Sequence, residues 1–257
     1  DSFGKSLLIE KKIKEIIENN FLRYGYAEIK SSPFEYTENI GGLLTDDLNN
    51  FSKDIFTFDD KYKKISLRFD LSAPLARIVS EKYLEFAFPF RRFQIAEVFR
   101  NETSKTGRGR YRSFFQGDFD QIFLGRVPPQ ANSEILQIIC DTMLDLKFKK
   151  EQFKINIFNR KIIDGFLNNL KIKDENQKFK VLRAIDKFDR IDENFIDLLQ
   201  KERVDPVSGD KIAGANLSND QATEVVEFLK LKDLKNLKLE SKNELQKEGV
   251  KELEEIL

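Results

Sequence analysis

Apolar positions recur every three or four residues near the start of the chain, and this spacing predicts an amphipathic helix over residues 6–23. Lysine and glutamate fill the positions between the apolar ones, and Gly25 suits the end of the helix. The apolar residues that recur at helical spacing are Ile9, Ile13, Ile16, Ile17 and Phe21. Helical spacing returns near the middle of the chain, where we expect helices over residues 132–146 and 159–170.

Between these helices, several short runs have the composition or the alternation of β-strands. We expect one hairpin from residues 55–58 and 65–69, turned at Asp59-Asp60, and a longer one in which residues 93–100 pair with a strand that starts at Arg110. The remaining predicted strands are residues 26–30 and 153–158. Residues 38–54 are polar and contain Gly41-Gly42, so we expect a mobile loop there.

The composition of the chain changes near residue 171, and charged, leucine-rich helical patterns follow from there to the last residue. A segment rich in Gly, Ser, Asn and Asp interrupts them at residues 205–219 and is expected to be a loop. We therefore predict an α+β fold, with a mostly antiparallel sheet flanked by helices in residues 1–170 and a small helical domain in residues 171–257.

The longer hairpin has an unusual concentration of arginine around a glycine-bearing loop. Strand alternation predicts that Arg110, Arg112, Phe114 and Gln116 share one face. A nucleotide could bind to a face with two guanidinium groups, an aromatic ring and an amide. Each guanidinium group can donate paired hydrogen bonds to phosphate oxygens, and the ring can stack on a base. The alternative is a surface hairpin with solvated arginines.

Composition excludes several kinds of chemistry. The chain has 257 residues with 44 basic and 44 acidic side chains, and this balance argues against nucleic-acid binding over the whole surface but not against one basic site. It contains no histidine, which removes catalytic triads and histidine-based metal sites. The single cysteine, Cys140, forms no disulfide within the chain. Without a membrane-length apolar run or a signal-peptide pattern, a cytosolic protein is expected, although a removed organelle-targeting segment is compatible.

Two segments together resemble the histidyl-tRNA synthetase family of class II aminoacyl-tRNA synthetases. Residues 100–120, which begin Arg100-Asn101-Glu102 and end Asp118-Phe119-Asp120, are similar to motif 2 of that class. Residues 67–77, LRFDLSAPLAR, resemble the amino-acid-binding stretch of the family, and their separation from Arg100 also matches. The first predicted helix, the strand after it and Pro33 resemble motif 1, which forms the dimer interface in this family.

The resemblance implies roles on the ATP side of a site. Arg100 would be the catalytic residue that binds the α-phosphate and the substrate carboxylate, and Glu102 would lie near the adenine or the tRNA end. Phe114 would stack on adenine, whereas Arg110 and Arg112 would line the triphosphate. Mg²⁺ would accompany ATP, with no metal ligand assigned in this chain.

The resemblance also implies an amino-acid pocket. Asp70 and Ser72, with Leu71 between them, would hold the substrate ammonium group, which must be paired when buried. Gln116 and Asp120 would complete the pocket, with Asp120 towards the imidazole ring of histidine. A structural alternative exists for Ser72, which could cap the helix that starts near Pro74.

The activity implied is ATP-dependent formation of histidyl-adenylate and transfer of histidine to tRNA(His), by a homodimer. Residues 171–257 would be the insertion domain that reaches towards the tRNA acceptor stem. Motif 3, the histidine-specific stretch and the anticodon-binding domain are absent, so we expect the isolated chain to be inactive.

Two other functions remain open. A non-catalytic paralogue would serve as a regulatory subunit of ATP phosphoribosyltransferase or as a sensor of uncharged tRNA, although a regulator need not keep the ATP-side arginines. A simple RNA-binding module would explain the basic hairpin but not the acidic residues expected in the pocket.

Overall fold

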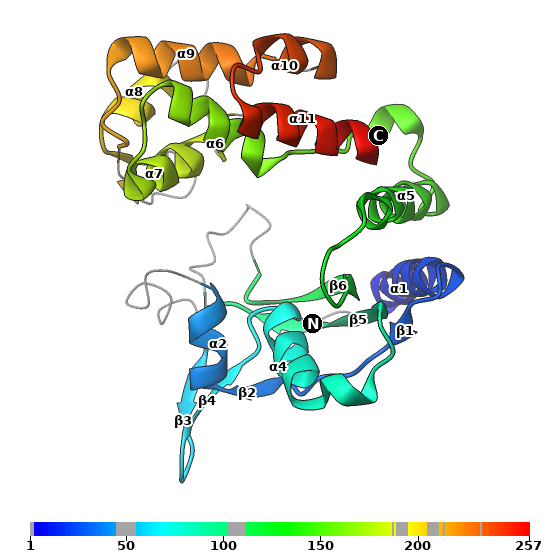
Figure 1. The fold of residues 1–257 in the computed structure, drawn as a ribbon. Helices are drawn as coiled ribbons and strands as arrows, with labels where there is room; N and C mark the ends of the chain where they lie inside the picture. Colours follow the sequence, from blue (N-terminus) through cyan, green and yellow to red (C-terminus); the bar gives the residue numbers. More distant parts are fainter. Residues whose placement is uncertain are drawn as a thin grey trace. The chain divides into compact units, whose positions relative to one another are not determined.

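The structure is a computed structural model that describes residues 3–44, 55–101, 111–186, 188, 195–204, 211–212, 214–231 and 233–257. The chain forms two compact units, which meet in the sequence between Lys154 and Ile155. Our sequence-based boundary lies later, at residue 170, because the helix of residues 160–169 was counted with the first domain. That helix packs on the last helix of the chain and belongs to the second unit (Figure 1).

The largest sheet of the first unit has the strand order β1-β5-β6. β5 (Phe90–Phe99) and β6 (Ser113–Ile122) pair antiparallel along their whole length, and β1 (Ala27–Glu28) lies parallel to β5. The helices α1 (Lys5–Arg23) and α5 (Pro129–Asp145) lie beside this sheet (Figure 1). The core that joins them is formed by Phe21, Tyr26, Phe93 and Ile138.

Alternation along β5 explains why one face is covered by helices. Phe93 is buried, and the ring of Phe21 from α1 lies 5.3 Å from its centroid and 4.7 Å from that of Phe119. Burying aromatic rings in such a cluster stabilises the packing of α1 on the sheet. The side chains that alternate with Phe93 and Phe119 therefore point to the opposite face.

A second small sheet has the order β2-β4-β3, formed by β2 (Phe34–Tyr36), β4 (Lys64–Leu67) and β3 (Thr57–Asp59). The predicted hairpin of residues 55–69 is confirmed, with its turn closed by the Asp60 amide, which donates to the Lys63 carbonyl over 3.1 Å. After β4 the chain forms α4 (Ser72–Lys82) and the short 3₁₀ turn η1 (Tyr83–Glu85).

The predicted mobile loop of residues 38–54 is wrong in its first part. Residues 37–44 form the helix α2 (Thr37–Leu44), and the rest of the predicted loop lies outside the described residues. Ile40 is buried against Ile55 and Phe69, so packing of one apolar side chain favours a helix that the polar composition and two glycines argue against.

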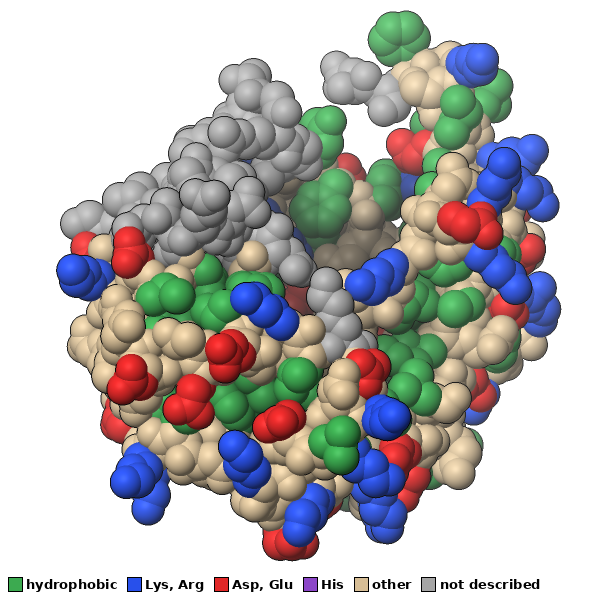
Figure 2. All heavy atoms as spheres, turned by 90° about the horizontal axis from the view of Figure 1, so that it is seen from above, with side chains coloured by type: hydrophobic (Ala, Val, Ile, Leu, Met, Phe, Trp, Pro, Cys, Tyr) green, Lys and Arg blue, Asp and Glu red, His purple; other side chains and the backbone are tan. Residues whose placement is uncertain are grey.

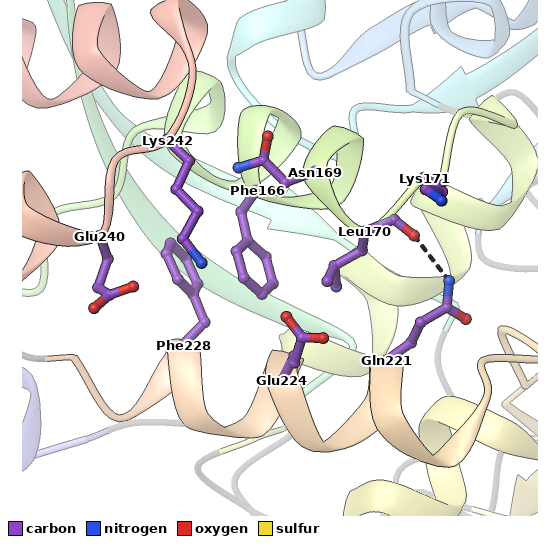
Figure 3. Close-up of a pocket in the computed structure, with 9 residues that line it drawn as sticks. All are labelled: Phe166, Asn169, Leu170, Lys171, Gln221, Glu224, Phe228, Glu240 and Lys242. Atoms are coloured by element: carbon purple, nitrogen blue, oxygen red, sulfur yellow. Dashed lines mark hydrogen bonds between the residues drawn. The ribbon is translucent and has the colours of Figure 1, made fainter.

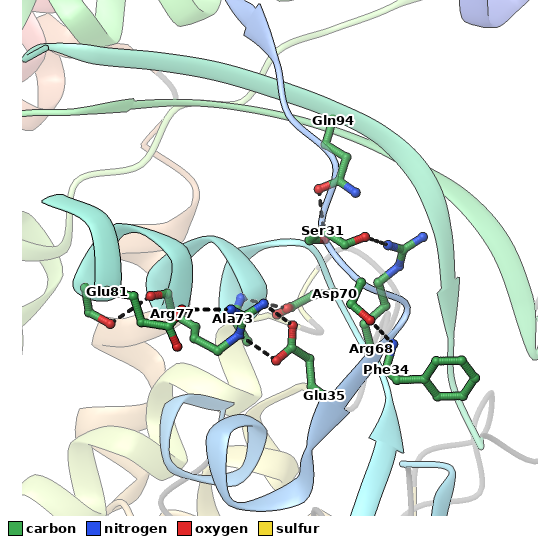
Figure 4. A network of polar contacts seen from close by, with 11 residues as sticks. Ser31, Phe34, Glu35, Arg68, Asp70, Ala73, Arg77, Glu81 and Gln94 are labelled. Atoms are coloured by element: carbon green, nitrogen blue, oxygen red, sulfur yellow. Dashed lines mark hydrogen bonds and ion pairs between the residues drawn. The ribbon is translucent and has the colours of Figure 1, made fainter. Parts of the chain in front are cut away.

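Buried polar contacts join the second sheet to β5 (Figure 4). The carboxylate of Glu35 accepts two hydrogen bonds from Arg77 of α4, over 2.8 and 2.9 Å. The buried Arg68 donates to the carbonyls of Ser31 over 3.0 Å and of Glu97 on β5 over 2.6 Å. The segment that leads into α4 is thereby held against β5, which places Asp70 near the face of the larger sheet that the helices leave uncovered.

The second unit is mainly helical. Its helices are α6 (Arg160–Asn169), α7 (Glu175–Ile185), α8 (Phe195–Gln200), α9 (Asn219–Leu229), α10 (Leu234–Glu240) and α11 (Glu244–Ile256). Side chains cap the first turns of five of them, and these caps are Asn159, Asp174, Ser218, Asp233 and Asn243. A continuous apolar core that includes Ile163, Leu167 and Val225 holds the unit together.

Two predictions for this part of the chain are wrong in detail. The predicted strand of residues 153–158 has the expected alternating exposure, but the structure assigns it no strand, and Ile157 packs on the cluster of Ile162, Val250 and Leu253 instead. The predicted loop of residues 205–219 contains β8 (Lys211–Ile212), which pairs with β7 (Arg203–Val204). The short 3₁₀ turn η2 (Lys150–Gln152) precedes the first of these segments.

The predicted α+β class is confirmed, with small, mostly antiparallel sheets flanked by helices in the first unit. On the face shown in Figure 2, lysine and arginine side chains are interspersed with aspartate and glutamate, in keeping with a formal net charge of zero. None of the described helices combines the length and apolar character that crossing a membrane requires.

Candidate functional site

The face of the β5–β6 pair opposite α1 and α5 carries the predicted site. Strand register pairs four residues of β5 with four of β6 on this face, and the pairs are Arg92 with Asp120, Gln94 with Asp118, Ala96 with Gln116, and Val98 with Phe114. Beyond the last pair, the Arg100 amide donates to the Arg112 carbonyl over 2.9 Å. Of the four residues predicted to share a face, Phe114 and Gln116 do so within β6, whereas Arg112 precedes the strand and Arg110, like Glu102, lies outside the described residues.

At one end of this face, the Arg100 guanidinium lies between two aromatic rings. Its central carbon is 4.5 Å from the ring centroid of Phe69 and 5.1 Å from that of Phe114. Its Nε also donates to the Phe69 carbonyl over 3.5 Å. Stacking on rings and a backbone contact orient the planar fork, and a guanidinium so oriented can bind phosphate or carboxylate oxygens in two-pronged fashion.

Arg112 is exposed, and so is its neighbour Tyr111. Phe114 is partly buried and contributes its ring to the contact with Arg100. The Gln116 side chain donates from Nε2 to Oδ1 of Asp118 over 2.8 Å, so its amide is oriented by a carboxylate on the same strand.

Beside the sheet, the chain turns from β4 into α4, starting from Arg68, whose carbonyl accepts a hydrogen bond from the Phe99 amide. Asp70 Oδ1 accepts a hydrogen bond from the Ala73 amide over 3.0 Å, and therefore Asp70, not Ser72, supplies the side-chain cap of this helix (Figure 4). The alternative role for Ser72 as the cap is wrong; Ser72 is exposed, and Leu71 is fully buried.

The sequence reasoning missed Arg92, which is fully buried on β5. Its guanidinium forms an ion pair with Asp120, and its Nη2 donates to the Leu71 carbonyl over 3.5 Å. Burial lowers the pKa of Arg92, and the nearby carboxylates of Asp120, Asp118 and Asp70 oppose this effect. A signal was available in the sequence, because antiparallel pairing around the loop places an arginine opposite Asp120 on a strand otherwise rich in apolar residues.

Asp120 has an unusual environment for a carboxylate. Burial raises its pKa, Arg92 lowers it, and Asp118 raises it further. Asp118 and Asp120 thus place negative charge towards one end of the face, whereas Arg100 lies at the other, and the charge of Asp70 also acts on Arg92. Such a polarised surface suits a molecule with a cationic group at one end and phosphate at the other.

A separate pocket lies within the helical unit (Figure 3). The rings of Phe166 and Phe228 stack there with centroids 4.0 Å apart, and Gln221 donates to the Leu170 carbonyl over 2.9 Å. The charged side chains of its lining are Lys171, Glu224, Glu240 and Lys242. None of the residues predicted for the site lines this pocket, and its charges balance.

Comparison with known proteins gives a consistent result. The model of the family described as histidyl-tRNA synthetase matches residues 9–207. The histidine–tRNA ligase of Pelagibacter ubique is 48% identical over 261 residues, covering 100% of this chain and 55% of that protein. The histidine–tRNA ligase of Rhodopseudomonas palustris is 38% identical over 223 residues, covering 85% of this chain and 42% of that protein.

Two solved structures share the fold over the whole chain. A histidyl-tRNA synthetase from Nostoc sp. PCC 7120 superposes with a TM-score of 0.75 at 23% identity, covering 100% of this chain and 54% of that one. A Bacillus halodurans protein described as an ATP phosphoribosyltransferase regulatory subunit/histidyl-tRNA synthetase superposes with a TM-score of 0.74 at 17% identity, covering 100% and 61%. The chain spans about half the length of the curated relatives it matches.

Proposed function

Because the chain belongs to the histidyl-tRNA synthetase family, we propose that the protein containing it is a histidine–tRNA ligase. In the first step the histidine carboxylate attacks the α-phosphorus of ATP, forming histidyl-adenylate and releasing pyrophosphate. In the second step a 3′-terminal hydroxyl of tRNA(His) takes the acyl group and releases AMP. The observation that supports this most is the single face shared by Arg100, Phe114, Gln116 and Asp120, with Asp70 at its edge.

Arg100 is proposed to stabilise the first step. Negative charge accumulates on the α-phosphate as the carboxylate attacks, and an oriented guanidinium placed at that charge lowers the barrier. The rings of Phe69 and Phe114 hold the fork in one plane before substrate arrives. Phe114 can also offer its ring to adenine, and Arg112, together with Arg110 and Glu102, is proposed to line the nucleotide site.

The carboxylate-rich end is proposed to take the amino acid. Asp70, with Leu71 and Ser72, is proposed to bind the ammonium group, and the amide of Gln116, which Asp118 orients, is proposed to bond to the same substrate. Asp120 is proposed to accept a hydrogen bond from the imidazole N–H. The carboxylates supply the negative charge that a partly desolvated ammonium requires.

Mg²⁺ is proposed to enter with the phosphates of ATP. Within the ranges that the structure describes, no group of three or more Cys, Asp or Glu side chains is arranged to hold a metal ion. The ion would neutralise phosphate charge.

The partners proposed are histidine, ATP, tRNA(His) and a second copy of the protein. Ile9 and Ile13 of α1 are 50% and 41% exposed, and this apolar strip supports a dimer through the motif 1 region. The helical unit is proposed as the insertion domain that approaches the acceptor stem. The isolated chain is proposed to lack aminoacylation activity, and its cytosolic location stays a prediction.

Histidine-dependent exchange of pyrophosphate into ATP by the full-length gene product tests the proposal. We expect exchange with histidine alone among the amino acids, and we expect Arg100→Ala to reduce kcat by about 10²- to 10³-fold, the usual effect of removing an oriented donor. Arg23→Ala is a matched control, because Arg23 lies on α1 and pairs with Asp141 at the surface. Exchange should be unchanged in that variant; absence of exchange in the unaltered protein would reject the ligase function.

The same experiment addresses the regulatory paralogue. A regulatory subunit would bind histidine without exchanging pyrophosphate. The Arg100 contacts favour the ligase, because a regulator has no need to orient a guanidinium at a reacting phosphate.

A further inference from the structure

The buried guanidinium of Arg92 is not explained by the stability of the fold alone. Its side chain is fully buried on β5, and it forms an ion pair with Asp120 of β6. Among the residues that the structure describes, no hydrogen-bond partner reaches its Nε or Nη1, although both atoms are buried. A guanidinium with buried, unsatisfied donors costs free energy, and apolar replacements of buried ion pairs are often as stable.

The charges around Arg92 explain what it can do. The carboxylates that act on Arg92 come from two parts of the chain, since Asp120 and Asp118 belong to β6 and Asp70 to the segment before α4. The Nη2 atom of Arg92 contacts both Asp120 and the carbonyl of Leu71, the residue that follows Asp70. One buried cation therefore connects the two halves of the proposed amino-acid pocket.

We propose that Arg92 is a positioning residue of the histidine pocket: its guanidinium holds the Asp120 carboxylate in an ion pair and fixes the Asp70–Ser72 turn relative to it. An ionised Asp120 with its charge partly balanced can accept a hydrogen bond from a neutral imidazole ring. Arg92 touches neither substrate nor the reacting atoms, so it acts through Asp120 and Leu71. This inference rests on the proposed function, because it assigns the ligand of the pocket.

The charges around Asp120 determine how histidine binding by an Arg92 variant should change with pH. Burial and Asp118 already raise the pKa of Asp120, and Arg92 is the group that lowers it. Removing the positive charge raises the pKa of Asp120 further, so its protonation begins at a higher pH in the variant than in the parent, and a protonated carboxyl group no longer offers two acceptor oxygens. Raising the pH should restore the ionised form and with it histidine binding.

The test compares Arg92→Met, Arg92→Lys and Arg91→Met in the full-length gene product, by pyrophosphate exchange between pH 6 and pH 9. Arg91 is a matched control, because it precedes Arg92 but donates on the helix side of the sheet, to Glu134 over 2.8 Å and to the Tyr24 carbonyl over 2.9 Å. For Arg92→Met we expect the KM for histidine to rise about 10- to 100-fold at pH 7. The KM for ATP should stay within about twofold, and the variant-to-parent ratio for histidine should fall as the pH rises.

Arg92→Lys should recover part of the loss, since it keeps the charge without the fork. Equal effects of Arg92→Met and Arg91→Met, or a loss for ATP and histidine alike without recovery at high pH, would show a structural role only and overturn the proposal. The ¹³C titration of the Asp120 carboxyl group supplies a readout without catalysis, and an Asp120 pKa that does not rise in Arg92→Met or Arg92→Gln also overturns it. Absence of exchange in the unaltered protein would reject the ligase function instead.

Discussion

The carboxylate of Asp70 has one structural role and one proposed binding role, and the two roles require different properties of the side chain. It accepts the Ala73 amide at the start of α4, which needs only an oxygen acceptor. It is also proposed to bind the substrate ammonium, which needs a negative charge. A substitution that keeps the oxygen and removes the charge separates the two.

We therefore predict that Asp70→Asn leaves the free energy of unfolding within about 0.5 kcal/mol of the parent, because asparagine caps a helix as well as aspartate does. The KM for histidine should rise about 10- to 100-fold, as for a lost charge-assisted hydrogen bond. Asp70→Ala should show the same KM effect and lose a further ~1 kcal/mol of stability. Urea unfolding and exchange kinetics measure the two quantities; an unchanged KM in Asp70→Asn contradicts the assigned role.

A second residue-scale prediction concerns Tyr26, which is buried between α1 and the sheet. Burial raises its pKa to about 12. In the unfolded chain a tyrosine has a pKa of about 10. Between about pH 10 and pH 12 the unfolded chain therefore loses the Tyr26 proton while the folded protein keeps it, which stabilises the unfolded state relative to the folded one. The contribution of Tyr26 is present below pH 10 and is lost as the pH rises through 12.

Parent protein should therefore lose about 2–3 kcal/mol more stability than Tyr26→Phe between pH 9 and pH 12. Other tyrosines and lysines titrate in the same range, and the comparison with the variant cancels them. Urea unfolding at several pH values measures the difference. Parallel curves for the two proteins would show that Tyr26 does not contribute.

What the sequence revealed of single residues depended on local pattern. Alternation was sufficient to place Phe114 and Gln116 on one face, because the period of a strand is two. The pairing of Arg92 with Asp120 depends on strand register across a loop, and the choice of Asp70 over Ser72 as the cap depends on where α4 begins. Neither is determined by a residue's immediate neighbours.

At the scale of elements, α6 and α11 approach closely because each has a glycine at the crossing. A β-carbon on Gly249 would lie 2.7 Å from Ile162 Cγ1 and 3.0 Å from the Ile162 backbone nitrogen. A β-carbon on Gly165 would lie 2.6 Å from Gln246 Cγ. The helices must separate to admit either side chain.

Gly249→Ala should therefore destabilise the protein by about 1–3 kcal/mol, the usual cost of overpacking, although alanine favours the helix itself. Lys247→Ala is the control, since Lys247 is exposed on the same helix and should change stability by less than about 0.5 kcal/mol. Thermal or urea unfolding decides the matter; a stabilised Gly249→Ala variant would show that the helices can move apart without cost.

Sequence patterns predicted the long elements and missed short ones. The periodicity of α1 extends over many residues, and the helix was located to within one residue at its start. In contrast, α2 is stabilised by the contact of Ile40 with Ile55 and Phe69, and residues 153–158 alternate without a neighbouring strand assigned to them. Tertiary contacts decide such short segments, and local composition does not record them.

At the scale of the whole molecule, the fold class could be predicted because strand-like and helical patterns are segregated along the chain. The boundary between the units could not, since α6 resembles the helices before it and its packing partner, α11, lies at the far end of the sequence. The resemblance to class II synthetases added the site, which composition alone could not identify.

The exposed strip of α1 leads to a prediction about assembly. Ile9→Glu should shift the full-length protein towards monomer, because it places a charge in the proposed interface. Lys11→Glu introduces the same charge on the opposite side of α1, at about 100° per residue, and should leave the dimer intact. Light scattering after size-exclusion chromatography measures both; a dimer that survives Ile9→Glu places the interface elsewhere.

Amino acid and nucleotide are proposed to bind side by side on the face of β5 and β6 opposite α1 and α5. A crystal structure of the full-length protein with histidine and a non-hydrolysable ATP analogue tests it most directly. We predict that the α-phosphate lies within hydrogen-bond distance of the Arg100 guanidinium. The ammonium group of histidine should contact Asp70, and its imidazole ring should contact Asp120. Nucleotide bound in the helical unit, or histidine bound away from Asp70 and Asp120, would contradict it.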